Sequence, residues 1–352
     1  MLCIMVGSVL AAFLVPLAAR AWLASPRPVE APVMAAAWDL RQRVSTNLTQ
    51  TIGMHPYPAV AAQGENVYAM WSKQEVSGTT DYDPCYNWAG NYGALMAWHN
   101  DALVADTGND TVNVDMAVDS AGGLHFVWAE ATGTPTHTLY YRYNTTGIEQ
   151  IAQYGGAVVP AVAVGNNQVH VVWSQGSDDI MYNHKTIGSG GWLGSAITVT
   201  SSSLLGNPAI AVDGSGKVHV VWDEGTGDDA EILYKNSDDW SSAPTTVSGD
   251  LSEEGEQRRP AIAASASDVY VVWCEYISDN VQYVRFGQST AWGSSKRISR
   301  DYLSANADIP TFLRPDIAVD DDGKLHVVFN GSTTGLGGYE KIFYASSSDG
   351  VH

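Results

Sequence analysis

Basic residues are scarce in this 352-residue chain. It contains 18 Lys and Arg against 38 Asp and Glu, which gives a formal net charge of −20 at pH 7 and a pI near 4.6. Because a protein binds the phosphates of nucleic acids through a basic surface, this balance disfavours a nucleic-acid partner. An acidic, lysine-poor surface suits a protein outside the cytoplasm, although charge alone does not fix a compartment.

Helix signals and short catalytic motifs are also scarce after residue 37. The sequence contains no nucleophile elbow, no phosphate-binding glycine loop and no H-E-x-x-H motif. Asp320-Asp-Asp-Gly323 predicts a hairpin turn, since the other ligand positions of a calcium loop are absent. The chain is instead well supplied with 34 Gly, 12 Trp and 17 Tyr, which fits short strands and many turns. We expect an all-β protein without a metal or a cofactor.

One pattern recurs six times: an apolar strand, a polar turn, and a second strand that ends on an aromatic residue. The copies run over Pro58 to Trp71, Val114 to Trp128, Pro160 to Trp173, Pro208 to Trp222, Pro260 to Trp273 and Pro315 to Phe329. The terminal aromatic residues follow one another at intervals of 57, 45, 49, 51 and 56 residues. A period near fifty with several strands per repeat is typical of a β-propeller, in which each repeat forms one small antiparallel sheet.

Each repeat continues with a third strand that carries a Tyr, and several have a fourth strand that follows a Trp, which makes a four-stranded blade. The last repeat ends after its third strand, because the chain ends at His352. Residues 38–47, which precede the first repeat, have the pattern of a fourth strand. We therefore predict a six-bladed β-propeller over residues 38–352. Its ring would be closed by Arg41 to Thr46 pairing with Lys341 to Ala345.

Residues 1–37 lie outside the predicted fold. Residues 1–19 form an apolar run, and Ala35-Ala-Ala37 offers a small-residue cleavage site at the end of a Pro/Ala-rich linker. This pattern indicates a signal peptide or an N-terminal membrane anchor, and a misassigned start codon is a third interpretation. Export or anchoring would place the propeller outside the cytoplasm, secreted or attached to the outer face of the membrane.

Cysteine is sparse, with only Cys85 and Cys274 inside the repeats. They belong to the first and fifth blades, which are not neighbours in a ring of six, so geometry argues against a disulfide between them. Four glycosylation sequons would matter only in a glycosylating host. They begin at Asn47, Asn109, Asn144 and Asn330.

The turn after the third strand resembles the Asp-box, S-x-D-x-G-x-x-W, in degenerate form at Ser347-Ser-Asp349-Gly350 and at Asn236-Ser-Asp-Asp-Trp240. The blade pattern as a whole is similar to the bacterial sialidase-like families, whose blades carry this bacterial neuraminidase repeat. In those families the Asp-box is a structural turn remote from the active site, so the resemblance implies a fold. It also implies three arginines for a sialate carboxylate, a Tyr nucleophile paired with a Glu, and an Asp acid/base on a first-blade loop.

The resemblance gives four candidate catalytic residues. Asp81 and Asp83 lie on the long first-blade loop where an acid is wanted, and Glu275 stands beside Tyr276. However, Tyr57 occupies the first-blade position before proline where the family has an arginine, and no R-I/L-P string occurs. These departures favour a recognition module for glycan or protein ligands, with sialidase-type glycoside hydrolysis as the alternative.

Long loops gather on one face, where each first strand begins and each second strand ends; we call this the entry face. They follow Trp71 and precede Pro260 and Pro315, in adjoining blades, which suggests a groove or pocket. Arginines before two of the first strands, on adjacent blades, would hold a carboxylate or sugar hydroxyls, and ion pairing with nearby acidic residues is the alternative. The predicted ligand-binding residues are Tyr57, Arg259, Arg314, His55, Asn113 and Asn207.

Two further positions recur along the blades. Glu130, Glu224 and Glu275 follow the strand-end aromatic by two residues, and we expect them to anchor loops by accepting backbone N–H groups. Histidines precede the aromatic by three residues in four blades, so they cannot converge on a metal ion and we expect them to pack between blades. They are His125, His170, His219 and His326.

Overall fold

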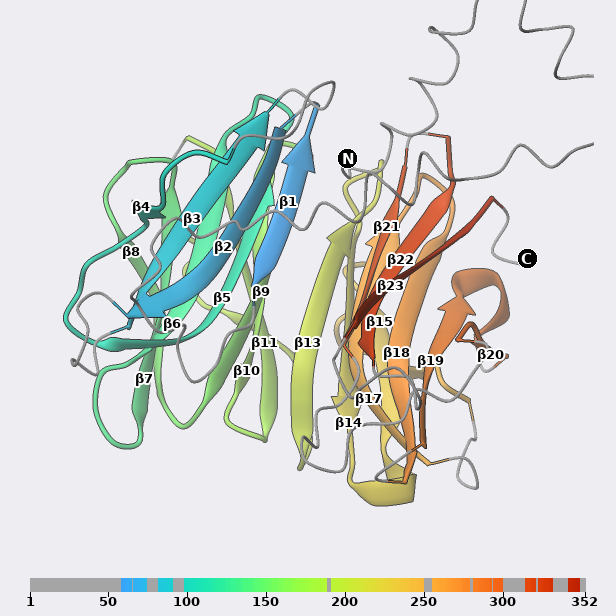
Figure 1. Ribbon diagram of the computed structural model, residues 1–352. Helices are drawn as coiled ribbons and strands as arrows, with labels where there is room; N and C mark the ends of the chain where they lie inside the picture. The colour runs from blue at the N-terminus through green and yellow to red at the C-terminus, as the bar shows by residue number, and fades with distance from the viewer. Residues whose placement is uncertain are drawn as a thin grey trace, which may run out of the picture.

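The chain folds as a six-bladed β-propeller, as the repeats predict (Figure 1). The computed structural model describes residues 58–64, 66–74, 82–90, 98–188, 191–249, 255–278, 281–292, 294–299, 314–320, 322–331 and 341–348. Six antiparallel sheets follow one another in chain order, and within each sheet every strand pairs with the next one along the chain. The blades have the colours of Figure 1 in sequence, from blue for the first to red for the sixth.

The strands of the six blades are as follows. Blade 1 contains β1 (Ala59–Gln63), β2 (Asn66–Gln74), β3 (Tyr82–Gly90) and β4 (Ala102–Leu103), and blade 2 contains β5 (Asp110–Val118), β6 (Leu124–Ala131), β7 (Thr136–Tyr143) and β8 (Glu149–Gly155). Blade 3 contains β9 (Val158–Gly165), β10 (Gln168–Gln175), β11 (Asp179–Thr186) and β12 (Ile197–Ser201), and blade 4 contains β13 (Leu205–Val212), β14 (Val218–Glu224), β15 (Glu231–Asn236) and β16 (Thr245–Thr246). Blade 5 contains β17 (Glu256–Ala264), β18 (Val269–Ser278), β19 (Val281–Gln288) and β20 (Lys296–Arg297), and blade 6 contains β21 (Pro315–Val319), β22 (Leu325–Gly331) and β23 (Lys341–Ser347).

Helix is confined, in the described residues, to the single 3₁₀ turns η2 (Gly227–Asp229) and η3 (Ser289–Ala291). No helix in this part of the chain is long and apolar enough to cross a membrane. The predicted signal peptide or membrane anchor lies within residues 1–37, which are outside the described residues.

The interfaces between blades form the core. Five clusters of buried side chains occur, and each joins two consecutive blades from the pair 1 and 2 to the pair 5 and 6. The aromatic residue that ends the second strand anchors each cluster against the preceding blade, because alternate side chains of a strand point to one face. These anchors are Trp128, Trp173, Trp222, Trp273 and Phe329.

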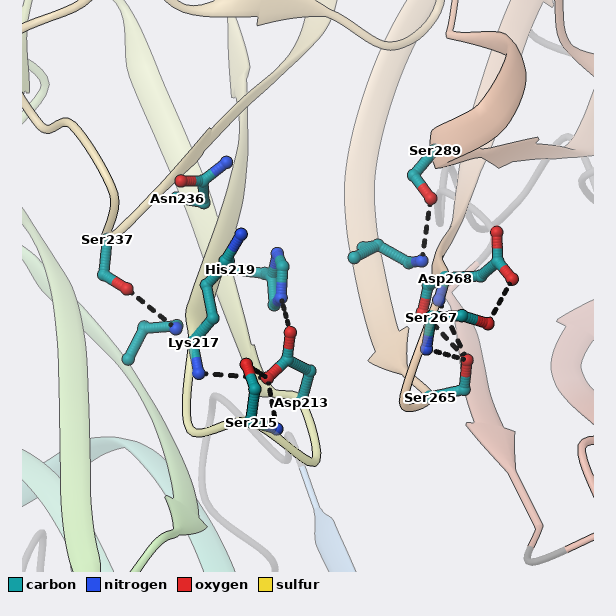
Figure 2. Close-up of polar contacts among 12 residues, drawn as sticks. Asp213, Ser215, Lys217, His219, Asn236, Ser237, Ser265, Ser267, Asp268 and Ser289 are labelled. Atoms are coloured by element: carbon teal, nitrogen blue, oxygen red, sulfur yellow. Dashed lines mark hydrogen bonds and ion pairs between the residues drawn. The ribbon is translucent and has the colours of Figure 1, made fainter.

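The turn between the first two strands accounts for the recurring His. In blade 4 the Asp213 carboxylate accepts the backbone N–H groups of Ser215 and Lys217, and it lies 3.2 Å from Nε2 of His219 (Figure 2). The Nδ1 atom of His219 is 2.7 Å from the hydroxyl of Tyr234 on the third strand. The same chain of contacts occurs in blades 2 and 6, as Asp119, His125 and Tyr141 and as Asp320, His326 and Tyr344.

The hydrogen bonds of these histidines thus run within one blade. Their rings are buried on the strand face that packs against the next blade, since Val127 and Val221, two residues after His125 and His219, belong to the clusters between blades. The Tyr that accepts or donates the hydrogen bond also contacts the next blade. Tyr141, Tyr182 and Tyr234 each pack against a Trp in the turn before the fourth strand of the next blade. Asp320 lies in a hairpin turn whose backbone N–H groups it accepts, as the sequence predicts.

Closure of the ring is a prediction that the described residues do not reach. Blade 6 shows β21, β22 and β23, and residues 38–47 lie outside the described part of the chain. We expect deletion of residues 1–47 to lower the thermal midpoint by at least about 5 °C relative to deletion of residues 1–37, because β23 would lose its outer partner. Calorimetry of the two truncated proteins measures the difference, and equal midpoints would show that this segment does not complete blade 6.

Candidate functional site

The entry face is the lower side of Figure 1, from which β1 and β13 rise. The innermost strands of consecutive blades contact one another from β1 to β21, so their first residues surround the mouth of a central channel. Three of these strands are irregular at this point. The register of β5 shifts between Thr111 and Asn113, that of β13 between Gly206 and Ala209, and that of β17 between Arg258 and Ala261. Such β-bulges redirect side chains and are frequent beside functional sites.

Arg259 lies in the bulge of β17 with a φ of 55°. This left-handed conformation is costly for a residue with a long side chain, and it persists only where the surroundings enforce it. The restraint is visible: the backbone N–H of Arg259 donates to the buried Asp223 carboxylate at 3.3 Å. Arg314 is exposed and directly precedes β21, which lies beside β17. Two of the predicted arginines thus lie at equivalent positions on adjacent inner strands.

Arg258, next along the chain, has a different role. Its guanidinium donates to Asp223 at 2.9 Å, to Glu256 at 2.7 Å and to the carbonyl of Gly225 at 2.7 Å. Burial disfavours its charge, but Asp223 and Glu256 outweigh burial and raise the pKa of Arg258 above its usual value. Arg258 therefore joins blades 4 and 5.

The two predicted asparagines also connect strands. The side-chain amide of Asn207 donates to Asp223 at 3.0 Å, and that of Asn113 donates to the carbonyl of Val158 in the next blade at 2.9 Å. Both hold the channel mouth in shape. Tyr57 and His55, the remaining predicted ligand-binding residues, lie outside the described residues.

The candidate Glu275 and Tyr276 are not brought together by the structure. They are consecutive on β18, so their side chains point to opposite faces of the sheet. Glu275 is fully buried, and its two oxygens accept Arg285 and Arg297 at 2.7 Å each. Burial, with Arg297 nearby, lowers the pKa of the Arg285 guanidinium to about 10.

The other recurring glutamates bind a side chain where a backbone group was expected. Glu130 accepts the indole N–H of Trp128 at 2.6 Å, and Glu224 accepts that of Trp222 at 3.2 Å. In both blades the donor is thus the aromatic residue that ends the same strand. The reason is spacing, since residues two apart on a strand lie on the same face.

Of the two first-blade aspartates, Asp83 is fully buried on β3, opposite Lys73 of β2, and Asp81 lies outside the described residues. Cys85 and Cys274 are buried thiols of blades 1 and 5 that are not joined to each other, as expected. Within the described ranges, no three or more His, Cys, Asp or Glu side chains are grouped so that they could hold a metal ion.

Two channel carboxyl groups escaped the sequence analysis. Asp115 of β5 accepts the N–H of Val162 in the next blade at 2.8 Å and that of Met116 at 2.9 Å. Burial is the main cause that raises the pKa of Asp115 to about 7, and the charge of Asp316 on β21 adds to it. The many protein atoms around the channel also raise the pKa of Asp316, although this residue is exposed to solvent. Two carboxyl groups from blades 2 and 6 therefore lie close enough for the charge of one to act on the other.

A sequence signal for this pair exists. The position that both aspartates occupy, second in each hairpin repeat, holds alanine in the other four copies. Those residues are Ala59, Ala161, Ala209 and Ala261.

No protein-family model and no curated protein matches this chain. Solved structures do match. An α-L-arabinanase from Penicillium chrysogenum, complexed with arabinobiose, aligns over 86% of this chain and 98% of its own, with 13% identity and a TM-score of 0.52. An α-L-arabinofuranosidase from Fusarium graminearum aligns over 85% and 97%, with 11% identity and a TM-score of 0.54. A leech intramolecular trans-sialidase aligns over 87% and 70%, with 7% identity and a TM-score of 0.57. At such low identities, these likenesses bear on the fold alone.

Proposed function

We propose that this protein is an extracytoplasmic carbohydrate-binding propeller whose ligand lies over the channel mouth at blades 5 and 6. The observation that carries the proposal is Arg259, held in a left-handed conformation at a bulge beside Arg314. A planar guanidinium offers a fork of donors that matches a carboxylate or adjacent sugar hydroxyls. In a chain with a net charge of −20, two arginines at one opening form a local site for an anionic group.

The surrounding structure supports a preorganised site. Asp223 holds Arg258, Asn207 and the backbone of Arg259, so the bulge is fixed before any ligand arrives. Preorganisation reduces the entropy lost on binding. Two of the neighbouring structures, the arabinanase and the trans-sialidase, are described in complex with sugars, which is consistent with a glycan ligand.

The consecutive arginines provide a matched test. We expect Arg259→Ala to weaken binding of an acidic glycan by about 1.5–3 kcal/mol, the loss of a charge-assisted hydrogen bond, and to lower stability less than Arg258→Ala does. Arg258→Ala should instead destabilise the fold, because it leaves Asp223 buried with one donor fewer. A panel of sialylated, uronate-containing and neutral glycans, followed by calorimetric titration of the best ligand, measures the first effect. Urea unfolding measures the second.

The proposal fails if no glycan on the panel binds, or if Arg259→Ala and Arg314→Ala bind as tightly as the unchanged protein. If only Arg258→Ala loses binding, the entry face must be correctly folded for binding but Arg259 and Arg314 do not contact the ligand. Equal affinity for neutral and acidic glycans would contradict the proposal that the two arginines recognise an anionic group.

Glycoside hydrolysis is the second candidate, and the channel carboxyl pair favours it. Hydrolysis of a glycosidic bond generally uses one protonated and one ionised carboxyl group. Asp115, with a pKa of about 7, keeps its proton near neutral pH more readily than an ordinary aspartate. Turnover of fluorogenic sialosides or arabinosides that is lost in Asp316→Asn would support an enzyme. Binding without turnover would favour a recognition module.

A further inference from the structure

Blade 3 departs from the hydrogen-bonding chain that its neighbours share. His170 donates or accepts at Nδ1 with the Tyr182 hydroxyl, 2.8 Å away, as the other histidines do with their Tyr. However, its turn has Gly165 where blade 4 has Asp213. A side chain cannot return to this position, because a Cβ at Gly165 would lie 2.5 Å from a methyl group of Val212 in blade 4. The Nε2 atom of His170 is buried without a hydrogen-bond partner of good geometry, although the carbonyl of Gly165 lies close by.

A second imidazole lies directly across from this one. His184 of β11 is the register partner of His170 on β10, so both rings project from the same face of the sheet. Their centroids are 5.8 Å apart with an interplanar angle of 28°. Nδ1 of His184 is also buried without a hydrogen-bond partner. Blades 4 and 5 have Asn236 and Gln288 at this position, and both amides are hydrogen-bonded.

We propose that His170 and His184 form a two-histidine binding site for a late first-row divalent metal ion, with Cu²⁺ bound most tightly and Ni²⁺ and Zn²⁺ more weakly. An unprotonated imidazole nitrogen is the ligand that these ions share, and their affinities follow the Irving–Williams order. Each nitrogen must approach the ion to about 2.1 Å, so binding requires the half-buried His184 ring to turn towards His170.

One of the two rings is held in place by its other nitrogen. The Tyr182 hydroxyl, on the same strand as His184, lies 2.8 Å from Nδ1 of His170, so Nε2 is the nitrogen of His170 that would bind the ion. An ion bound by both imidazoles joins β10 to β11.

The test uses the full chain after treatment with a chelator. We expect calorimetric titration with Cu²⁺ to give one site per chain and the electron paramagnetic resonance spectrum to show coupling to two imidazole nitrogens. His184→Asn, which installs the residue of blade 4, should weaken Cu²⁺ binding at least tenfold and remove one nitrogen coupling. The matched control is His137→Gln, which replaces a histidine on β7 of blade 2 and should leave the affinity unchanged.

Each of three results would overturn the site. One is the absence of a stoichiometric Cu²⁺ site, and another is a spectrum with a single coupled nitrogen. The third is unchanged Cu²⁺ affinity in His184→Asn, which would place the ion on other histidines. Thermal unfolding of every variant in chelator confirms that the comparison is made between folded proteins.

Discussion

Glu275→Gln should destabilise the propeller by about 3–5 kcal/mol, although it changes one atom. The carboxylate is fully buried and is shared by Arg285 and Arg297, so its replacement removes a counter-charge common to two guanidinium groups. Breaking a buried ion pair by removing one partner has a cost of this size. Urea unfolding followed by tryptophan fluorescence measures the loss.

The matched control is Glu224→Gln in blade 4. Glu224 is half-buried and accepts one indole N–H, which an amide oxygen still accepts, so its replacement should cost less than about 1 kcal/mol. Equal effects of the two replacements would contradict the argument. The comparison also bears on catalysis, because loss of activity in a Glu275 variant would reflect unfolding unless stability is measured alongside.

Asp115 should make the protein more stable as the pH falls from 8 to 4.5. Its pKa is about 7 in the fold, mainly because it is buried, and 3.8 is the ordinary value. Between these values the folded chain binds a proton that the unfolded chain does not, so stability increases as pH falls through the window and is lost above it. The contribution amounts to about 3 kcal/mol over this range.

Other groups titrate in the same pH range, so the quantity to measure is the difference in unfolding free energy between the unchanged protein and Asp115→Asn. Burial lowers the pKa of His125 and of His219, and their contributions to stability are lost as pH falls below about 6.5. Comparing the unchanged protein with Asp115→Asn cancels these terms, and the gap between their unfolding free energies should grow by about 3 kcal/mol towards pH 4.5.

Asp213→Asn serves as the control. Despite burial, hydrogen bonds from Ser215 and His219 lower the pKa of Asp213 to about 2. Its titration therefore falls outside the window, and the gap from the unchanged protein should stay constant. A constant gap for Asp115→Asn as well would show that Asp115 is ionised throughout.

The fold was predictable because the repeat is long and its strands are short and well separated. Six aromatic residues at regular intervals determine the number of blades, and the hairpin turns determine which strands pair. The hydrogen bonds of the histidines were missed because sequence spacing places His219 on a strand but does not reveal Asp213 six residues earlier or Tyr234 fifteen later as its partners. Those contacts depend on the register of three strands.

The site was predictable only in part. The residue before each inner strand was used to predict Arg259 and Arg314. The sequence does not show that a β-bulge follows Arg258, and this bulge gives Arg258 and Arg259 different surroundings. Glu275 looked like a partner for Tyr276 because the two are adjacent in the chain, whereas strand geometry sends adjacent side chains apart. Asp115 and Asp316 were overlooked because the six hairpins were compared for the residues that they share. At the position of these two aspartates the other four hairpins have alanine.

The chain of contacts from Asp through His to Tyr occurs in blades 2, 4 and 6. Those blades have hairpin repeats of 15 residues, whereas blades 1, 3 and 5 have repeats of 14, and the missing residue lies in the turn that would supply the Asp. The ring therefore alternates between two kinds of blade. In these hairpins the repeating unit is a pair of blades, about one hundred residues long, and the internal symmetry is threefold rather than sixfold.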